Sequence, residues 1–375
     1  MLVGKQFFFL LIFLVSSLFI YSAELILLDG SVHKGDVSFK DNFFVVKGKA
    51  FPIGTVLEIK LSKGFPQKLE SQHRIFTIDG SCFLGAVKTG SDSKIKVWDV
   101  ESQPYEIQLS KVHAISFKEI KKNVTYRSPV NNNYIVMVHG KVIKCDLEFF
   151  TFVNVGVKVG KNSLKLKKSL INRLNLRPKT KINPDHNIIL KSRYGDSIYG
   201  KLLKLGLNIE IETVLGTKVF DSSDVLSLEL VSDSIKYLND LKPTKIETVP
   251  YLDMIQKPTF NQGLFGGSVK IRKKRYNTGI CMQSRTTITY NIEKKYSRFE
   301  AEIALDIANA FSGNADFIVL GDGKLLYKKN VSLKYTMIKV DVPIKGVTNL
   351  SLKLDYGKNG SSGDFGIWGS PRLIK

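Results

Sequence analysis

Two side chains near the C-terminus combine chemistry that suits sugar recognition. Trp368 offers an aromatic face for stacking on sugar C–H groups, and Asp364 offers a carboxylate that accepts hydrogen bonds from hydroxyls. The tryptophan stands in Gly366-Ile367-Trp368-Gly369, and these glycines predict a flexible loop beside Asp364. A second interpretation stays open, because most tryptophans are largely buried. In it, Trp368 packs in a core and Asp364 caps a turn.

Asp306 supplies another candidate chemistry, metal binding. Its carboxylate, together with nearby backbone carbonyls, could hold a calcium ion, because calcium takes oxygen ligands. One carboxylate makes a thin calcium site, so Asp306 could equally end the strand that precedes it. Calcium is the only cofactor that the sequence suggests.

Signatures of catalysis are lacking elsewhere in the sequence. The histidines are isolated, without metal-ligand spacing or a nucleophile partner: His33, His73, His113, His139 and His186. No signature places two carboxylates on facing elements, as glycoside hydrolysis requires. The glycine-rich segment 263–267 does not follow a strand and open a helix, so it predicts no phosphate-binding loop. The sequence therefore favours a binding protein over an enzyme.

The strands that must position these residues are clearest over 298–327. Apolar and charged residues alternate along 299–307, which predicts a strand with one buried face. A mostly polar loop, 309–316, precedes a short apolar strand, 317–320. Gly321-Asp322-Gly323 then predicts a hairpin turn. This order is typical of an antiparallel β-sandwich.

Upstream, one pattern occurs four times: an apolar strand, a tight turn that contains glycine, and a second strand. The turn glycines lie 50, 60 and 55 residues apart: Gly30, Gly80, Gly140 and Gly195. Glycine takes the positive φ that such a turn demands, so each copy predicts a hairpin. Each copy also closes on an apolar strand, and these strands are 56–59, 112–117, 171–176 and 225–230.

The copies predict four small β-barrel-like modules in a row, whose neighbours cover their edges. Independent hairpins in one irregular sheet are the alternative. The expected boundaries of the repeats are 24–72, 73–130, 131–182 and 183–231. Residues 232–261 contain three prolines and a possible short helix at 235–241, so they predict a linker to a sandwich at 262–375.

The sandwich segment carries an ordered set of short matches to a known family. They are 276–280, Ser284, 288–292, 296–306, 317–327, 347–357, Asp364, Trp368 and 371–373. In this order they resemble the NPCBM family of carbohydrate-binding modules, which are often attached to glycoside hydrolases. The resemblance covers roughly the last third of the chain. It implies a discoidin-like β-sandwich that holds a sugar in loops at one end.

The resemblance also bears on individual residues. It adds Tyr276 and Ser284 to Trp368 and Asp364 as candidate carbohydrate-binding residues. The loop after Gly279, where members of this family usually have a histidine, here reads Ile280-Cys281-Met282-Gln283.

A second such histidine is usual beside the aspartate that matches Asp364, and this chain has Phe365 there. If those histidines contact the ligand, sugar binding in this chain is altered or absent.

The N-terminus has the pattern of a secretory signal. Lys5 precedes an uncharged apolar run at 7–20, and Ala23 is a small residue at the expected cleavage site. The predicted signal peptide is 1–23. The run is short for a membrane span, although an uncleaved anchor stays open as the alternative. The expected location is therefore secreted or in the cell envelope.

The chain is strongly basic, with 56 Lys and Arg residues against 34 Asp and Glu residues and a net charge of +22. Such a charge attracts anionic surfaces. Short basic clusters lie at 165–168 and 272–275, and most other basic residues are scattered, so a solvated basic surface and a specific anionic partner both stay open. The export signal and the lack of interleaved aromatic and basic residues disfavour nucleic acid as a partner.

Three cysteines, Cys82, Cys145 and Cys281, are far apart and odd in number, which predicts buried free thiols. Taken together, the sequence predicts an all-β protein with tandem small β-barrel-like repeats followed by a discoidin-like β-sandwich. The expected function is that of an exported, non-catalytic carbohydrate-binding protein whose repeats act as a scaffold. A structural or adhesive cell-envelope protein that binds anionic polymer is the alternative. A third possibility is a subunit of an enzyme whose catalytic chain is separate.

Overall fold

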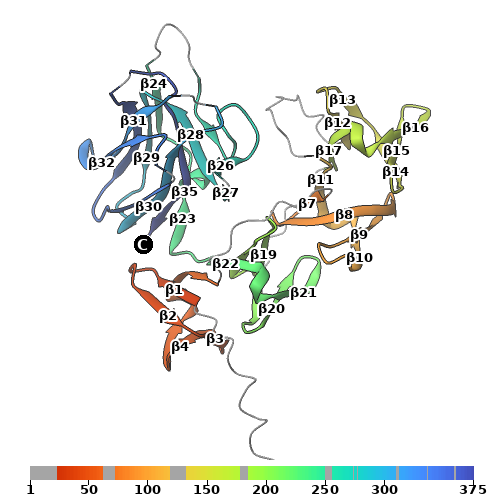
Figure 1. Ribbon diagram of the computed structural model, residues 1–375, viewed down its shortest axis with the longest axis horizontal. Helices are drawn as coiled ribbons and strands as arrows, with labels where there is room; N and C mark the ends of the chain where they lie inside the picture. The colour runs from red at the N-terminus through yellow and green to blue at the C-terminus, as the bar shows by residue number, and fades with distance from the viewer. Residues whose placement is uncertain are drawn as a thin grey trace, which may run out of the picture. The chain divides into compact units, whose positions relative to one another are not determined.

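The computed structural model describes residues 23–61, 72–118, 132–177, 185–249, 256–272, 274–276, 278–309, 312–335, 337–358 and 360–375. These residues form β-strands, turns and single-turn 3-10 helices (Figure 1), which confirms the predicted all-β class. No helix within these ranges is long and apolar enough to span a membrane. The predicted signal peptide lies outside them except for its last residue, Ala23.

The chain divides into two compact units, which are treated separately below. The first contains Met1–Gly64, Asp185–Arg193 and Tyr199–Leu230. The second contains Phe65–Pro184, Tyr194–Ile198 and Val231–Lys375. The first unit therefore holds the first repeat and most of the fourth, while the second holds the two middle repeats and the C-terminal sandwich.

All four repeats have the same order of elements: an opening hairpin, a meander, a 3-10 turn and a closing strand. The first repeat contains β1 (Ala23–Leu27), β2 (Val32–Gly35), β3 (Val37–Lys40), β4 (Phe43–Val46), β5 (Lys49–Pro52), η1 (Ile53–Thr55) and β6 (Val56–Lys60). The second contains β7 (His73–Thr77), β8 (Cys82–Ser91), β9 (Lys94–Trp98), β10 (Pro104–Gln108), η2 (Leu109–Lys111) and β11 (Val112–Ser116).

The third repeat contains β12 (Tyr134–Met137), β13 (Val142–Lys144), β14 (Asp146–Phe150), β15 (Asn154–Val159), β16 (Asn162–Lys167), η3 (Lys168–Leu170) and β17 (Ile171–Asn175). The fourth contains β18 (Ile188–Ser192), β19 (Ser197–Lys204), β20 (Asn208–Thr213), β21 (Gly216–Asp221), η4 (Ser222–Asp224) and β22 (Val225–Leu230). The four predicted turn glycines all have positive φ: Gly30 at 86°, Gly80 at 95°, Gly140 at 93° and Gly195 at 104°. Strand pairing across the turn confirms the hairpins at Gly30, Gly80 and Gly140, and Gly195 has the backbone conformation that the fourth predicted turn requires.

The closing strands join the repeats in two pairs, the first repeat with the fourth and the second repeat with the third. In the first unit β6 pairs with its own opening strand β1 and with β22 of the fourth repeat. In the second unit β11 pairs with β7 and with β17 of the third repeat. The prediction that neighbouring modules in a row cover one another is therefore wrong for the first and fourth repeats. Each closing strand hides its free edge against another closing strand, wherever that strand lies in the sequence.

Each repeat is barrel-like but open. In the second repeat the strand order is β11-β7-β8-β9-β10, and among the described residues β10 pairs only with β9. The concave side of the second repeat is lined by buried aliphatic residues such as Ile75, Val87, Ile95, Val97 and Ile107. Alternate residues of its meander face solvent, as the period of two in a strand requires.

The C-terminal part of the second unit is the predicted β-sandwich. Its strands are β23 (Ile235–Tyr237), β24 (Lys245–Thr248), β25 (Thr259–Phe260), β26 (Val269–Ile271), β27 (Lys274–Tyr276), β28 (Gly279–Gln283), β29 (Thr286–Asn291), β30 (Arg298–Leu305), β31 (Asn314–Gly321), β32 (Lys324–Ser332), β33 (Ile338–Pro343), β34 (Asn349–Tyr356) and β35 (Phe365–Ile374). One sheet has the order β25-β28-β35-β30-β33 with β23 beside β35, and the facing sheet has the order β24-β29-β34-β31-β32. The hairpin β26–β27 is separate.

The predicted strands of the segment 298–327 are confirmed as β30, β31 and the start of β32, and β31 pairs with β32 across the predicted turn. β30 and β31 lie in opposite sheets of the sandwich. Residues 235–248, expected as part of a linker with a short helix, instead form β23, the 3-10 turn η5 (Leu238–Asp240) and β24. β23 and β24 pair with sandwich strands β35 and β29, and this pairing satisfies backbone groups that a linker would leave to water.

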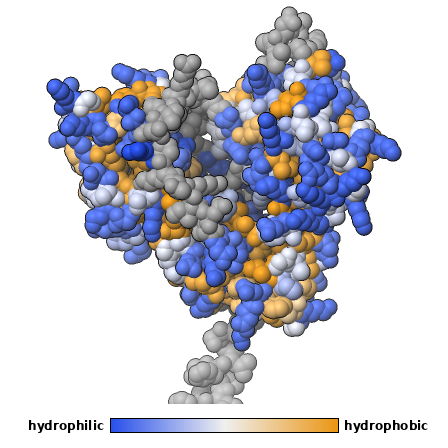
Figure 2. Space-filling view, turned by 180° about the vertical axis from the view of Figure 1, so that it is seen from behind, coloured by the Kyte–Doolittle hydropathy of each residue, from blue (hydrophilic) through white to orange (hydrophobic). Residues whose placement is uncertain are grey.

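The three cysteines are free and buried, as predicted. Hydrophilic residues cover much of the visible face in Figure 2, with apolar residues between them. Among the apolar side chains that remain exposed are Phe152 and Val153 in the third repeat, at 65% and 59%.

Candidate functional site

One sheet of the sandwich has an inner face and an outer face that follow from strand alternation. On β28 and β35, Met282 and Trp368 point inward to the main core, while Cys281 and Ile367 belong to a smaller cluster on the other side. The segment 263–276, including the hairpin β26–β27, covers part of that outer side through Leu264, Val269 and Tyr276. Side chains on this outer face do not belong to the main core of the sandwich.

Trp368 does not present its ring to solvent. It lies within strand β35 rather than in a loop, its exposed fraction is 0%, and its ring packs against Phe299 and Phe317 with centroids 6.3 and 5.1 Å away. The glycines of Gly-Ile-Trp-Gly do not mark a flexible loop. Gly366 instead allows the side chain of Leu354 to pack against the backbone, because a Cβ there would lie 2.7 Å from a methyl of Leu354. The prediction that Trp368 stacks on a sugar is therefore wrong, and the packing alternative holds.

Asp364 and Ser284 lie together, but both are buried, at 1% and 5% exposure. The Asp364 Oδ1 accepts a hydrogen bond from the Asn314 backbone N–H at 2.9 Å, and the Ser284 N–H donates to the Asp364 carbonyl at 3.0 Å. Burial raises the pKa of Asp364 to about 6, although the bonds from Asn314 and Ser284 act in the opposite direction. These two residues tie three loops together at one end of the sandwich, so the direct sugar contact predicted for them is not available.

Tyr276 is also buried, and it lies near the opposite end of β28 from Ser284. Its hydroxyl donates to Glu302 Oε2 at 2.5 Å, and its ring packs over Gly369, where a Cβ would approach it to 2.6 Å. The Lys274 Nζ lies 2.6 Å from the same Glu302 carboxylate. The structure therefore does not gather the four predicted sugar-binding residues into one site.

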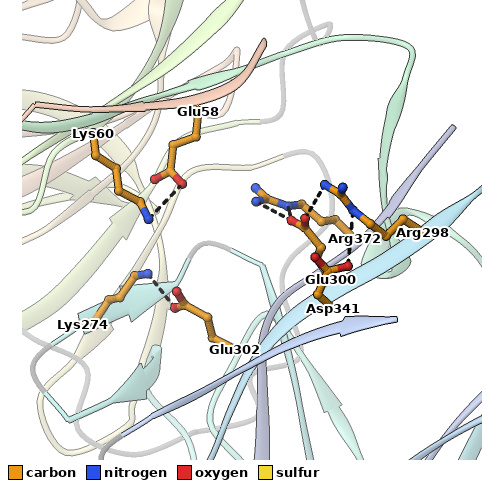
Figure 3. Close-up of polar contacts among 8 residues, drawn as sticks. All are labelled: Glu58, Lys60, Lys274, Arg298, Glu300, Glu302, Asp341 and Arg372. Atoms are coloured by element: carbon orange, nitrogen blue, oxygen red, sulfur yellow. Dashed lines mark hydrogen bonds and ion pairs between the residues drawn. The ribbon is translucent and has the colours of Figure 1, made fainter. Parts of the chain in front are cut away.

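The outer face of β30 carries a row of paired charges, drawn in Figure 3. The Glu300 carboxylate accepts from Arg372 Nε and Nη2 at 3.0 and 2.8 Å and from Arg298 Nη2 at 2.6 Å. Arg298 also lies 3.4 Å from Asp341. Every charged group of this cluster has an opposite partner, so the cluster stabilises the sheet face and leaves no charge for a ligand.

Glu302 follows Glu300 by two residues on the same face of β30. Burial raises the pKa of Glu302, but Lys274 and the Tyr276 hydroxyl more than offset this, so the pKa lies below its usual value. A general acid in glycoside hydrolysis needs a raised pKa. Glu302 therefore lacks the raised pKa of a general acid.

Asp306 stands just after β30 and caps the turn that follows. Its Oδ1 accepts from the Ala308 N–H at 3.1 Å and its Oδ2 accepts from Asn309 Nδ2 at 2.7 Å. In the described part of the chain, no three His, Cys, Asp or Glu side chains form a group that could hold a metal ion. The observed bonds fit the strand-ending interpretation of Asp306.

Another set of side chains converges at this end of the outer face. Gln283 and Phe365 are register partners on β28 and β35, and the Asp306 N–H donates to the Phe365 carbonyl at 2.8 Å. The Phe265 ring, 40% exposed, meets the Phe365 ring edge-on with centroids 4.7 Å apart. We call Phe265, Phe365, Gln283 and Asp306 the outer-face site.

The outer-face site combines an aromatic pair, an amide and a carboxylate on a rigid sheet end. The Asp306 charge contributes, after burial, to raising the pKa of the Cys281 thiol to about 12. The Gln283 Oε1 accepts from the Gln256 N–H at 3.3 Å, so its amide is held in place. Aromatic faces and fixed hydrogen-bonding groups are the requirements of sugar recognition.

Sequence reasoning did not select Phe265, Gln283 or Phe365 as site residues. A signal was nevertheless present, because 280–283 and Phe365 are the two places where the resemblance expects histidines. In the folded chain Gln283 and Phe365 are adjacent across two strands.

The two facing sheets of the C-terminal part define a β-sandwich. The class of this sandwich is given by its sequence: residues 235–374 match the family described as NPCBM/NEW2 domain. The match confirms the resemblance seen for the C-terminal third of the chain. It also begins at the residue where β23 begins, in agreement with the pairing of that strand into the sandwich.

Two solved structures illustrate the similarity. One is a CBM51 module from Clostridium perfringens GH95 in complex with methyl-galactose, which is 21% identical over 37% of this chain and 99% of that chain, with a TM-score of 0.33. The other contains tandem CBM51 modules of Sp3GH98 from Streptococcus pneumoniae SP3-BS71, 16% identical over 75% of this chain and 88% of that chain, with a TM-score of 0.34. Among curated proteins, none matches the chain significantly.

Proposed function

We propose that this chain is an exported, non-catalytic carbohydrate-binding protein whose C-terminal sandwich holds the sugar. The observation that carries the proposal is the match of residues 235–374 to the NPCBM/NEW2 domain family. The low pKa of Glu302 and the paired state of Glu300 support a role without catalysis. The signal pattern at 1–23 supports export to the cell envelope or beyond.

Within the sandwich, we place the sugar on the outer-face site rather than at Trp368. Phe265 and Phe365 would supply C–H stacking, and Gln283 and Asp306 would supply hydrogen bonds to hydroxyls. Where the resemblance expects two histidines, this chain has Ile280-Cys281-Met282-Gln283 and Phe365, so the sugar preferred here would differ from that of relatives with both histidines.

The test is glycan binding by the full chain and by two variants, one in the site and one outside it. Phe365→Ala removes one stacking face and should weaken binding roughly 2- to 10-fold, the range for an aromatic contact. Leu325→Ala is the control, because Leu325 is 60% exposed on β32 of the facing sheet and its loss should leave affinity unchanged. Failure of the full chain to bind any glycan on an array would overturn the proposal.

Calcium is a secondary possibility at Asp306. Because both carboxylate oxygens of Asp306 already accept hydrogen bonds from its own turn, we expect glycan binding to be equal in calcium and in EDTA. A loss of binding in EDTA that calcium restores would instead assign the metal to this turn.

The second candidate function is adhesion to an anionic cell-surface polymer through the basic surface. It is favoured by the net charge of +22 and by exposed Lys165 and Lys167 on β16. Ionic strength distinguishes the two functions: an electrostatic contact weakens steeply as salt rises, whereas a stacked neutral sugar is hardly affected.

A further inference from the structure

The second and third repeats place two exposed aromatic rings beside one lysine. Trp98 is 37% exposed at the end of β9, and Phe152 is 65% exposed in the turn between β14 and β15. The Lys88 Nζ lies 4.8 Å from the centre of the Trp98 ring and 5.9 Å from the centre of the Phe152 ring. One ammonium thus bridges two aromatic faces that come from different repeats. We call Trp98, Phe152 and Lys88 the repeat platform.

Lys88 is aimed at these rings by a β-bulge. The pairing of β8 with β9 shifts register between Val87 and Thr89, and Lys88 is the extra residue. β8 is a long strand that also pairs with β14, through Phe149 opposite Ser91 (Figure 1). Bulges re-aim side chains and are common next to binding sites. The same strand therefore carries Lys88 and brings the turn with Phe152 alongside it.

A buried lysine, Lys168, joins the backbone at Lys88 to the backbone at Phe152 by hydrogen bonds. The Lys168 Nζ, in a residue only 6% exposed, donates to the carbonyls of Val87 at 2.7 Å, Lys88 at 3.3 Å and Phe152 at 3.4 Å. On the other side of the bulge, the His73 Nδ1 accepts from the Val87 N–H at 3.0 Å. Burial, followed by the charges of Lys168 and Lys88, lowers the pKa of His73 to about 4, which keeps this acceptor neutral. The backbone at Val87, Lys88 and Phe152 is thus held in place before any ligand arrives.

The platform has the charge of a site for an anion. Lys88 forms no ion pair with a described residue, and Lys168 bonds only to carbonyls within the same ranges. Lys96 stands on the same exposed face of β9 as Trp98, two residues before it. Of the acidic side chains on the meander, Glu106 is paired with Lys94 at 3.0 Å, and Asp99, directly after Trp98, accepts hydrogen bonds from the backbone N–H groups of Glu101 and Gln103. Apolar docking surfaces for proteins are depleted of charge at their centre, and this one has a lysine there.

We propose that the repeat platform is a second binding site of this chain, and that it takes an acidic polysaccharide. Trp98 and Phe152 stack on sugar rings, while Lys88 pairs with a carboxylate carried by the sugar. The choice of a sugar over other acidic polymers rests on the proposed function of the sandwich. The platform itself does not, because it is built from residues of the second and third repeats alone.

The two tryptophans of the chain make the site observable in the full-length protein. Acrylamide should quench Trp98, at 37% exposure, and hardly reach Trp368, at 0% exposure. An oligogalacturonate bound at the platform should protect Trp98 from acrylamide. The fully methyl-esterified oligosaccharide of the same length offers the same stacking surface without charge, so it should protect several-fold less.

Variants locate the effect. Phe152→Ala should weaken oligogalacturonate binding roughly 2- to 10-fold, and Lys88→Gln should do so about 2- to 5-fold and abolish the preference over the methyl ester. Lys144→Gln is the matched control, since it removes the same charge from the exposed end of β13 and should change nothing. Phe365→Ala should also change nothing, so a failure of the sandwich site and a failure of the platform give different results.

Three results would overturn the proposal. One is the absence of Trp98 protection by oligogalacturonate at any concentration up to saturation of the assay. Another is an equal loss of affinity in Lys88→Gln and Lys144→Gln, which would mean that net charge alone attracts the polymer. The third is tighter protection of Trp98 by oligothymidylate than by oligogalacturonate, which would assign the stacking rings to single-stranded nucleic acid.

Discussion

The sandwich and the repeats each contain one of the two tryptophans. The sandwich buries its tryptophan, whereas the repeats leave theirs partly exposed. Trp368 is enclosed between two sheets, in a core with Phe299 and Phe317. Trp98 lies on the outside of a single curled sheet, beside Lys88. A two-layer sandwich has room for an indole, whereas the small concave face of a repeat is filled by isoleucine and valine. A large aromatic residue in a repeat therefore stays outside, where it is available to a ligand.

Substitution of the two tryptophans should give the largest difference in the free energy of unfolding. Trp368→Ala should lower the free energy of unfolding of the sandwich by about 3–5 kcal/mol, because it leaves a cavity in a packed core. Trp98→Ala should change stability by less than about 0.5 kcal/mol, as expected for a surface position. Calorimetry of the full chain measures both. Trp368→Phe is the control, and it should cost less than Trp368→Ala because the indole N–H has no hydrogen-bond partner among the described residues.

If Trp98→Ala proved as destabilising as Trp368→Ala, the contrast between the two regions would be lost. The repeat platform would then be a structural contact rather than a surface prepared for a ligand.

The repeats show how far sequence patterns reach. The turn glycines and the closing strands were predictable because hairpins depend on local chemistry, such as the positive φ of Gly80. The pairing of β6 with β22 was not predictable, because any of the four closing strands offers a similar apolar edge. Which edges meet is decided by contacts between residues far apart in the sequence.

In the sandwich, the elements were more predictable than the site. The strands and the tight turn of 298–327 follow from alternation and glycine spacing. The role of Trp368 could not be inferred, because glycines beside it are consistent with a flexible loop and with close packing against Leu354. Phe265 and Phe365 are 100 residues apart in sequence, and only the folded sheet brings their rings to 4.7 Å.

The buried charge of the repeats offers a second measurement, through pH. Burial, and then the charge of Lys88, lowers the pKa of Lys168 from 10.5 to about 8. Between these values the unfolded chain binds more protons than the folded chain, so this group makes stability rise as pH increases from about 8 to 10.5. Its contribution is lost as pH falls toward 8. The size of the change is on the order of 1–3 kcal/mol.

Lys168→Met should flatten that rise in the repeats. The measurement is the difference in calorimetric stability between the two proteins at several pH values, since other titrating groups cancel in the difference. Lys165→Met, at an exposed position on β16, is the control and should leave the slope unchanged. An unchanged slope in Lys168→Met would show that Lys168 is not held in its buried position, and its hydrogen bonds to the backbone at Lys88 and Phe152 would be absent.

The sandwich has a buried charge of the opposite sign, which gives the smallest of the three effects. Burial raises the pKa of Asp364 from 3.8 to about 6, so the folded chain binds more protons than the unfolded chain between these values. Stability from this group is fully present below pH 3.8 and is lost as pH rises through 6. Lys168 thus adds stability to the repeats as pH rises above neutrality, while Asp364 adds stability to the sandwich as pH falls below neutrality.

Asp364→Asn should abolish the change in unfolding free energy that this carboxyl causes between about pH 4 and pH 6, which is on the order of 1–2 kcal/mol. The pH dependence that Lys168 contributes above pH 8 should stay intact. The amide can still accept from the Asn314 N–H, so the loops remain joined. In a Trp98→Phe background, Trp368 fluorescence reports unfolding of the sandwich alone, because Trp368 is then the only tryptophan. If the pH profile did not change on Asp364→Asn substitution, the carboxylate would have to be hydrated in solution. The end of the sandwich beside the outer-face site would then be open to water. Of Trp368 and Asp364, only Trp368 would then be buried in solution.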